Sequence, residues 1–119
     1  MDVRKLSDAV SVAPKLSVRE IAEAARLGFR TLINNRPDGE DFLQPSAREL
    51  EAAAREQGLE YHHLPVVSGA LTERDVHAFR ALLAHAEQPV LAFCRSGTRS
   101  ATLWALALAG GGNADEVIA

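Results

Sequence analysis

The chain has 119 residues and a formal net charge of −3, from 13 Lys and Arg against 16 Asp and Glu. Hydrophobic residues make up 47% and charged residues 24%, a globular balance that excludes a disordered chain. The length predicts one domain over 1–119, and the mild acidity disfavours nucleic acid as a partner. The single cysteine excludes an internal disulfide and favours a cytoplasmic location. The longest apolar run, 101–109, is too short to span a membrane.

Strands and helices are predicted to alternate along the chain. Short apolar or β-branched runs predict strands at 10–13, 30–34, 60–64 and 90–93. Three segments begin with the capping box that opens a helix, a hydroxyl residue followed three positions later by a carboxylate: Ser17 with Glu20, Ser46 with Glu49 and Thr72 with Asp75. Another helix is expected at 101–108. The stretch 113–119 resembles the opening turn of one more helix, so we expect the C-terminal helix to be truncated.

This order predicts an α/β fold with a small, mostly parallel central sheet flanked by helices. The run Val90–Phe93 is almost entirely apolar, which is typical of a buried central strand. In open α/β sheets, ligands bind at the carboxyl ends of central strands, where a loop leads into a helix. Cys94 follows this strand directly, so we expect the functional site in the loop between the last strand and the last helix.

Residues 94–100 combine a nucleophile with groups that bind anions. The positive end of the following helix and two arginines favour the thiolate form of a cysteine. Successive backbone N–H groups can form an anion nest, and the planar fork of an arginine matches an oxyanion. We predict Cys94 and Arg99 as catalytic residues. The expected anion-binding loop comprises Arg95, Ser96, Gly97, Thr98 and Ser100, with the two serine hydroxyls contacting the thiolate or the anion.

The alternative for Cys94 is a buried structural cysteine followed by an exposed basic turn, because free cysteines are often buried. A polar, glycine-containing turn with two arginines disfavours that interpretation.

Three segments together resemble the phosphatase-like domain of the bacterial beta-lactamase hydrolase-like proteins: 34–40 (Asn-Asn-Arg-Pro-Asp-Gly-Glu), 64–70 (Leu-Pro-Val-Val-Ser-Gly-Ala) and 93–100 (Phe-Cys-Arg-Ser-Gly-Thr-Arg-Ser). The resemblance implies a dual-specificity protein tyrosine phosphatase-like fold and a phosphatase or hydrolase activity, with rhodanese-like sulfurtransferases among the members. It also implies that Arg36 or Glu40 lines or braces the pocket. A fused or associated persulfide dioxygenase is the partner that it suggests.

Two departures from the tyrosine phosphatase pattern favour sulfur over phosphorus. Phe93 stands where that pattern has histidine, and four residues rather than five separate Cys94 from Arg99, which resembles a rhodanese loop. A phosphate ester also needs a general acid for its leaving group. The stretch 64–70, where such phosphatases place that acid, has no carboxylate. Sulfane-sulfur transfer needs none, because sulfite and thiolates leave as stable anions.

We therefore predict a sulfurtransferase in which Cys94 takes sulfur from thiosulfate or a persulfide and passes it to a thiol such as glutathione. The alternative is a phosphatase that works through a Cys94 phosphocysteine. Its general acid would be one of four carboxylates: Asp38, Glu40, Asp41 or Glu73. A third possibility is a non-catalytic anion-binding module. No cofactor is expected, and adjacent His62 and His63 point to opposite faces of a strand, which predicts no shared metal site.

Overall fold

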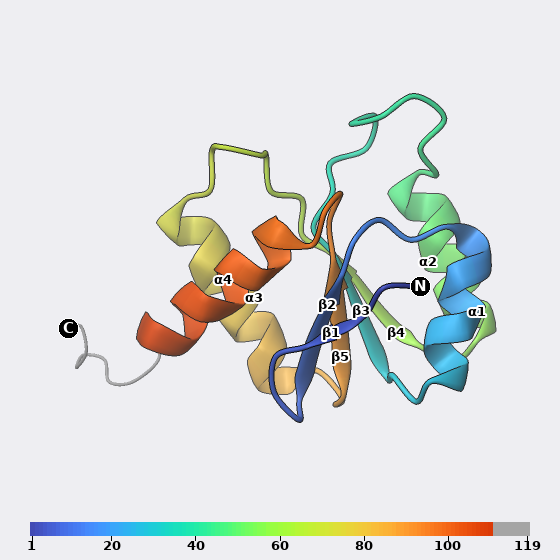
Figure 1. The fold of residues 1–119 in the computed structure, drawn as a ribbon, viewed down its shortest axis with the longest axis horizontal. Helices are drawn as coiled ribbons and strands as arrows, with labels where there is room; N and C mark the ends of the chain where they lie inside the picture. The colour runs from blue at the N-terminus through green and yellow to red at the C-terminus, as the bar shows by residue number, and fades with distance from the viewer. Residues whose placement is uncertain (111–119) are drawn as a thin grey trace.

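A computed structural model describes residues 1–110 (Figure 1). The predicted alternation of strands and helices is confirmed. The elements are β1 (Arg4–Lys5), β2 (Val10–Ala13), α1 (Val18–Arg26), β3 (Thr31–Asn34), α2 (Ala47–Glu56), β4 (Glu60–His63), α3 (Glu73–His85), β5 (Val90–Phe93) and α4 (Thr98–Gly110). The helical turn expected at 113–119 lies outside the described residues.

The five strands form one sheet in the order β1-β2-β5-β3-β4. β2, β5, β3 and β4 run parallel, as predicted, and only β1 is antiparallel. The sequence did not predict β1, because its two residues are both charged and exposed and give no apolar pattern. In the register of the sheet, Phe93 of β5 pairs with Ala13 on one side and Asn34 on the other. The last residues of β2, β3 and β5 therefore lie side by side in the sheet, and Cys94 follows the last residue of β5.

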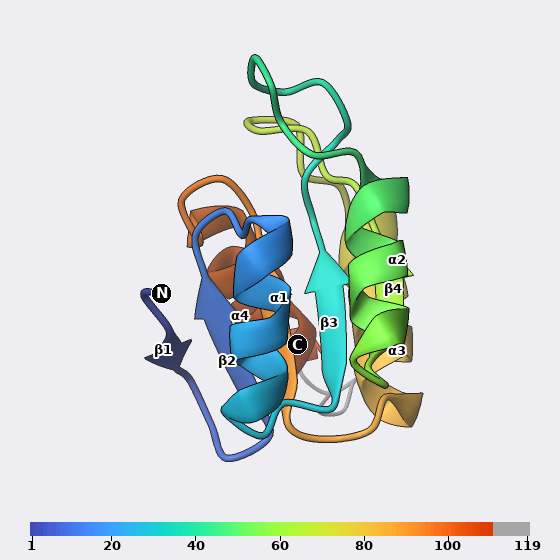
Figure 2. The same ribbon diagram turned by 90° about the vertical axis from the view of Figure 1, so that its right-hand side faces the viewer.

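Helices cover both faces of this sheet (Figures 1 and 2), α1 and α2 on one side and α3 and α4 on the other. Successive residues of β5 alternate between two hydrophobic clusters, with Val90 and Ala92 in the α3/α4 cluster and Leu91 and Phe93 in the α1/α2 cluster. Because both faces of β5 are buried, the strand is a continuous apolar run rather than an alternating one.

The capping boxes predicted at the starts of α1, α2 and α3 are all present. The start of α4 differs from the prediction, because the helix begins at Thr98 and not at 101. Residues 98–100 are polar and carry no apolar periodicity, so the sequence pattern could not place them in the helix. As a result, Arg99 and Ser100 lie in the first turn of α4 rather than in the preceding loop.

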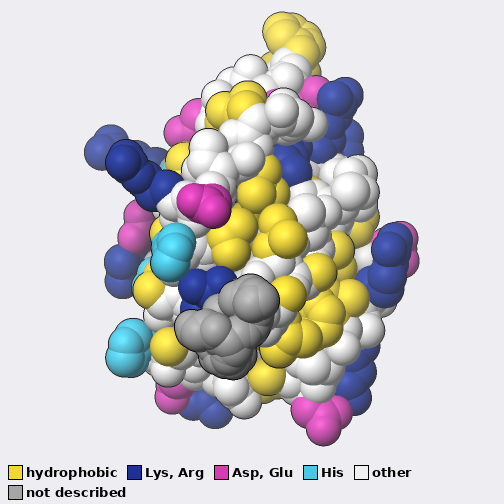
Figure 3. Space-filling view, turned by 90° about the vertical axis from the view of Figure 1, so that its left-hand side faces the viewer, with side chains coloured by type: hydrophobic (Ala, Val, Ile, Leu, Met, Phe, Trp, Pro, Cys, Tyr) yellow, Lys and Arg dark blue, Asp and Glu magenta, His cyan; other side chains and the backbone are white. Residues whose placement is uncertain are grey.

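Hydrophobic side chains gather on the face formed by the α3/α4 layer (Figure 3). The exposed large residues of α4 are Leu106 and Leu108. Among the described helices, none has the length and apolar character that crossing a bilayer requires.

Candidate active site

Cys94 is held at the level where β2, β3 and β5 end. Its backbone N–H donates to the carbonyl of Ala13 at 3.4 Å, and its Sγ accepts a hydrogen bond from the Gly97 N–H at 3.1 Å. The side chain has no exposed surface. Cys94 thus lies beneath the loop, and a reaction at Sγ requires the groups above it to shift when a substrate enters.

The loop turns sharply at Gly97, whose φ of 92° is rarely adopted by residues with a side chain. This turn lets Gly97 approach the end of β2, where a Cβ atom on it would lie 3.5 Å from the Ala13 carbonyl. The same turn directs the Gly97 N–H back to the sulfur atom. The glycine therefore sets the path of the backbone around Cys94.

Several backbone donors of this segment remain free for a ligand. Within residues 1–110, no hydrogen-bond partner is found for the N–H groups of Arg95, Ser96, Arg99 and Ser100. The last two belong to the first turn of a 13-residue helix, whose N-terminus attracts anions. The hydroxyl of Ser96 bonds the Thr98 hydroxyl instead of pointing to the sulfur. This arrangement can hold an oxyanion.

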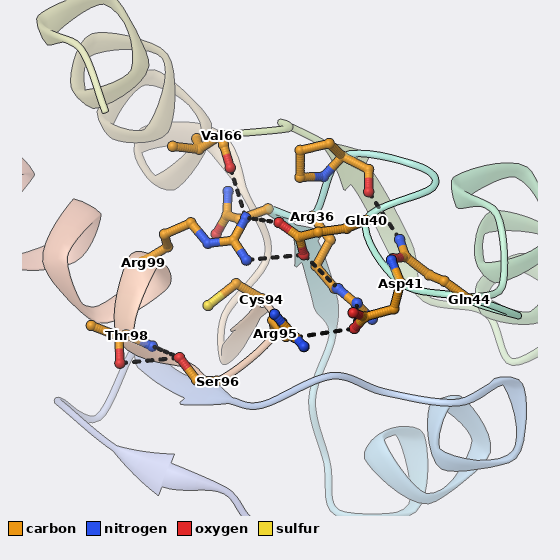
Figure 4. Close-up of polar contacts among 12 residues, drawn as sticks. Arg36, Glu40, Asp41, Gln44, Val66, Cys94, Arg95, Ser96, Thr98 and Arg99 are labelled. Atoms are coloured by element: carbon orange, nitrogen blue, oxygen red, sulfur yellow. Dashed lines mark hydrogen bonds and ion pairs between the residues drawn. The ribbon is translucent and has the colours of Figure 1, made fainter. Parts of the chain in front are cut away.

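Arg99 reaches across the site to two segments that follow other strands (Figure 4). Its Nη1 donates to the carbonyl of Val66 at 2.8 Å and lies 2.7 Å from Glu40 Oε2. Its Nη2 donates to Glu40 Oε1 at 3.0 Å. The hydrogen bond from Arg99 lowers the pKa of Glu40, although partial burial of this carboxyl group acts in the opposite direction. Glu40 is therefore ionised and fixes the guanidinium group.

A buried arginine organises the carboxylates around Arg99. The Arg36 side chain is 4% exposed, and its Nε donates to Glu40 at 3.1 Å while its Nη2 donates to Asp41 at 2.6 Å. Asp41 in turn pairs with Arg95, whose Nε lies 3.2 Å away. The two carboxylates thus tie the segment after β3 to the cysteine loop, and Arg36 contacts both of them.

Asn35 was not predicted as a site residue, yet it links three segments of the site. Its side chain accepts a hydrogen bond from the Ser100 hydroxyl at 2.8 Å and donates to the Leu64 carbonyl at 2.9 Å. Its backbone donates to Phe93 and accepts from Val66. The Ser100 hydroxyl therefore bonds Asn35 in this structure, not the thiolate. The sequence did contain an indication of this role, because a polar residue directly after a buried strand needs hydrogen-bond partners.

A cavity of about 640 Å³ opens above the loop. Three basic residues line it, Lys15, Arg95 and Arg99, together with the hydroxyl residues Ser68, Ser96, Thr98 and Thr102. No carboxylate belongs to this lining, so far as residues 1–110 are concerned. The cavity is therefore suited to negatively charged ligands.

The four carboxylates considered as general acids are either engaged in hydrogen bonds or ion pairs, or lie outside the cavity above the cysteine loop. Asp38 accepts a hydrogen bond from the Ala47 N–H at the start of α2, at 2.7 Å. Glu40 and Asp41 are both ion-paired with arginines. Glu73 is exposed in the first turn of α3 and lines a separate groove. In this conformation none of the four is a free acid beside Cys94.

The histidines take separate roles in the structure. His62 pairs with Glu60, and His63 Nε2 lies 2.7 Å from the carbonyl oxygen of Arg36. Over the described part of the chain, no three His, Cys, Asp or Glu side chains gather as metal ligands would.

Residues 2–111 match the family model of the beta-lactamase hydrolase-like protein, phosphatase-like domain. A beta-lactamase hydrolase-like protein of Xylella fastidiosa (strain Temecula1) is 39% identical over 106 residues, which cover 89% of this chain and 25% of that protein. A crystal structure from Neisseria meningitidis Z2491, described as a candidate phosphatase, is 37% identical with a TM-score of 0.86 and covers 94% of this chain and 80% of that one.

A second solved structure, Tk-PTP in its active form, has a TM-score of 0.74 at 22% identity, covering 93% of this chain and 74% of that one. At this identity the likeness concerns the fold alone. The predicted phosphatase-like α/β fold is confirmed by both structures. The chain spans about a quarter of the length of the curated relative from Xylella.

Proposed function

The chain belongs to the phosphatase-like domain family of the beta-lactamase hydrolase-like proteins, and we propose that it hydrolyses phosphorylated substrates through a Cys94 phosphocysteine. The family and the structural relatives support this alternative over the predicted sulfurtransferase. The observation that carries the proposal is the position of Cys94 in one loop with Arg99 and with four N–H groups that have no partner among residues 1–110, the kinds of group that a phosphoryl dianion needs.

In the first step the Cys94 thiolate attacks the phosphorus atom, the bond between phosphorus and the leaving oxygen breaks, and the leaving oxygen keeps the electron pair. The Gly97 N–H stabilises the thiolate before attack. The free N–H groups of the loop and the Arg99 guanidinium bind the equatorial oxygens, where negative charge accumulates in the transition state. Glu40 holds this guanidinium in place through one hydrogen bond and one further ion-pair contact.

In the second step water attacks the phosphocysteine. The S–P bond breaks, the electron pair returns to the sulfur atom of Cys94, and inorganic phosphate leaves with the oxygen and both hydrogens of the water. The same loop binds both transition states, so Cys94 and Arg99 take part in both steps.

Rapid quenching with p-nitrophenyl phosphate followed by intact-mass measurement tests the proposal. We expect one phosphoryl adduct on the wild type and none on Cys94→Ser. A matched incubation with thiosulfate separates the other functions. An added sulfur atom without any phosphoryl adduct would establish the sulfurtransferase. The absence of both adducts, with phosphate still raising the Tm, would indicate an anion-binding module.

One observation keeps the sulfurtransferase as a second candidate. Four residues separate Cys94 from Arg99, one fewer than in the tyrosine phosphatase pattern, and a shorter loop is expected to draw its N–H groups toward the sulfur atom. A loop of that size favours a persulfide, whose outer sulfur is smaller than a phosphoryl group. The thiosulfate arm of the experiment addresses this candidate directly.

A further inference from the structure

The cavity above the cysteine loop carries more positive charge than one phosphoryl group requires. Arg99, held by Glu40, and the four N–H groups without a partner among residues 1–110 supply enough donors for the three oxygens of a transferred phosphoryl group. Lys15 and Arg95 line the same cavity in addition. Lys15 makes no ion pair with any residue between 1 and 110, and the Arg95 side chain is 62% exposed although it contacts Asp41. Both cations are available to a second anionic group.

The carboxylates of the site are not placed to protonate a leaving group. Glu40 is held by two arginines, with its Oε2 2.7 Å from Arg99 and its Oε1 3.1 Å from Arg36. Asp41 is held between Arg36 and Arg95. An alkoxide leaves only with the help of an acid, whereas a phosphate leaves as a stable anion. The site therefore favours a leaving group that is stable as an anion and needs no proton when it departs.

We propose that the substrates are phosphoanhydrides, in which the leaving group is itself a phosphate bound by Lys15 and Arg95. This proposal rests on the proposed function. The Cys94 thiolate attacks the terminal phosphorus, and the bond from that phosphorus to the bridging oxygen breaks. The bridging oxygen keeps the electron pair and departs on the leaving phosphate, whose added negative charge the two cations stabilise. Water then releases the terminal phosphate from Cys94, as in the ester reaction. No oxidant, reductant or external acid takes part.

Three substrates in metal-free buffer test this assignment: inorganic pyrophosphate, p-nitrophenyl phosphate and glycerol phosphate. Their leaving groups are a phosphate, an acidic phenol and an alcohol. We expect hydrolysis of the first two and kcat/KM for glycerol phosphate lower than for pyrophosphate by on the order of a hundredfold, the usual contribution of general acid catalysis. Equal kcat/KM values for glycerol phosphate and pyrophosphate would overturn the phosphoanhydride assignment but would not contradict the proposed phosphatase function.

Lys15→Gln tests the cation, with Lys5→Gln as its control, because Lys5 is the other lysine of the chain and pairs with Asp8 on the surface. We expect Lys15→Gln to lower kcat/KM for pyrophosphate on the order of tenfold, since a charge-assisted contact is lost, and to lower kcat/KM for p-nitrophenyl phosphate by a smaller factor, because that substrate has no second phosphate. Equal losses for both substrates would also overturn the assignment. If the wild type hydrolyses none of the three substrates and forms no phosphocysteine, both the phosphoanhydride assignment and the proposed phosphatase function are refuted.

Discussion

Glu40 and Arg99 form a two-point contact between the segment after β3 and the first turn of α4. Glu40 Oε2 lies 2.7 Å from Arg99 Nη1, and Glu40 Oε1 accepts a hydrogen bond from Nη2 at 3.0 Å. Both side chains are largely buried, at 17% and 11% exposure. The carboxylate thus orients the guanidinium group, and it also cancels part of the positive charge that an incoming anion meets.

These two effects of Glu40 predict opposite changes in binding and turnover. In Glu40→Gln the negative charge beside the anion site is lost, so inorganic phosphate should bind about threefold more tightly. The guanidinium group loses its charged partner, and kcat for p-nitrophenyl phosphate should fall about tenfold. Calorimetric titration with phosphate and steady-state kinetics measure the two effects separately.

Glu51→Gln is the matched control for this substitution, because Glu51 pairs with Arg55 on the exposed side of α2. It should change neither phosphate affinity nor turnover. Weaker phosphate binding in Glu40→Gln would contradict the electrostatic part of the argument, and unchanged kcat would contradict the positioning part.

The conformation of Gly97 leads to a second prediction. Gly97→Ala places a Cβ at a φ of 92°, which should cost about 1–2 kcal/mol of unfolding free energy and distort the N–H groups around Cys94. Gly28→Ala is a close control, since Gly28 has a φ of 98° at the end of α1 with no atom near the added Cβ. Both variants should lose stability in urea titrations.

Only Gly97→Ala should also lose activity, by more than tenfold in kcat/KM, because only this glycine shapes the anion loop. An equal loss in Gly28→Ala would show that the activity follows global stability and not the geometry of the loop.

The sequence predicted the parts of this fold that depend on local pattern. The capping boxes at Ser17, Ser46 and Thr72 mark helix starts through bonds that span three residues, so they can be recognised without tertiary structure. The apolar strand Val90–Phe93 likewise shows its burial in its composition. Because parallel strands end at one edge, these elements also place Cys94.

The contacts around Cys94 could not be predicted in the same way. Arg99 meets Glu40 across 59 positions of the chain, and Ser100 meets Asn35 across 65. Such pairs depend on the order of β3 and β5 in the sheet, which local patterns do not contain. The start of α4 at Thr98 was also missed, because its first turn faces the site and has polar side chains.

Asn35 is expected to contribute more to stability than its small size suggests. It is fully buried, and Asn35→Ala would leave the Ser100 hydroxyl and the Leu64 carbonyl without their present partner. Unsatisfied buried polar groups cost about 1–3 kcal/mol each, so the unfolding free energy should fall by at least about 2 kcal/mol. Urea unfolding measures the loss, and Ser96→Ala in the exposed part of the loop serves as control. A loss below about 0.5 kcal/mol, the range of ordinary surface substitutions, would contradict this role.

The last prediction concerns acid stability and the pair of Glu60 with His62 on β4. The hydrogen bond from His62, helped by the Glu87 N–H, lowers the pKa of Glu60 below its ordinary value of 4.5, while partial burial acts against this. A carboxyl group with a lowered pKa in the folded state adds stability above its unfolded pKa. That contribution is lost as the pH falls from about 4.5 through the folded pKa.

The unfolding free energy should therefore decline as the pH is lowered through this range, and Glu60→Gln should make the decline shallower because the amide cannot titrate. Urea unfolding at a series of pH values measures the slope for wild type and variant. Glu56→Gln is the control, since Glu56 is the exposed last residue of α2. An equally steep decline in Glu60→Gln and wild type would show that other carboxylates, Glu40 among them, account for the acid sensitivity.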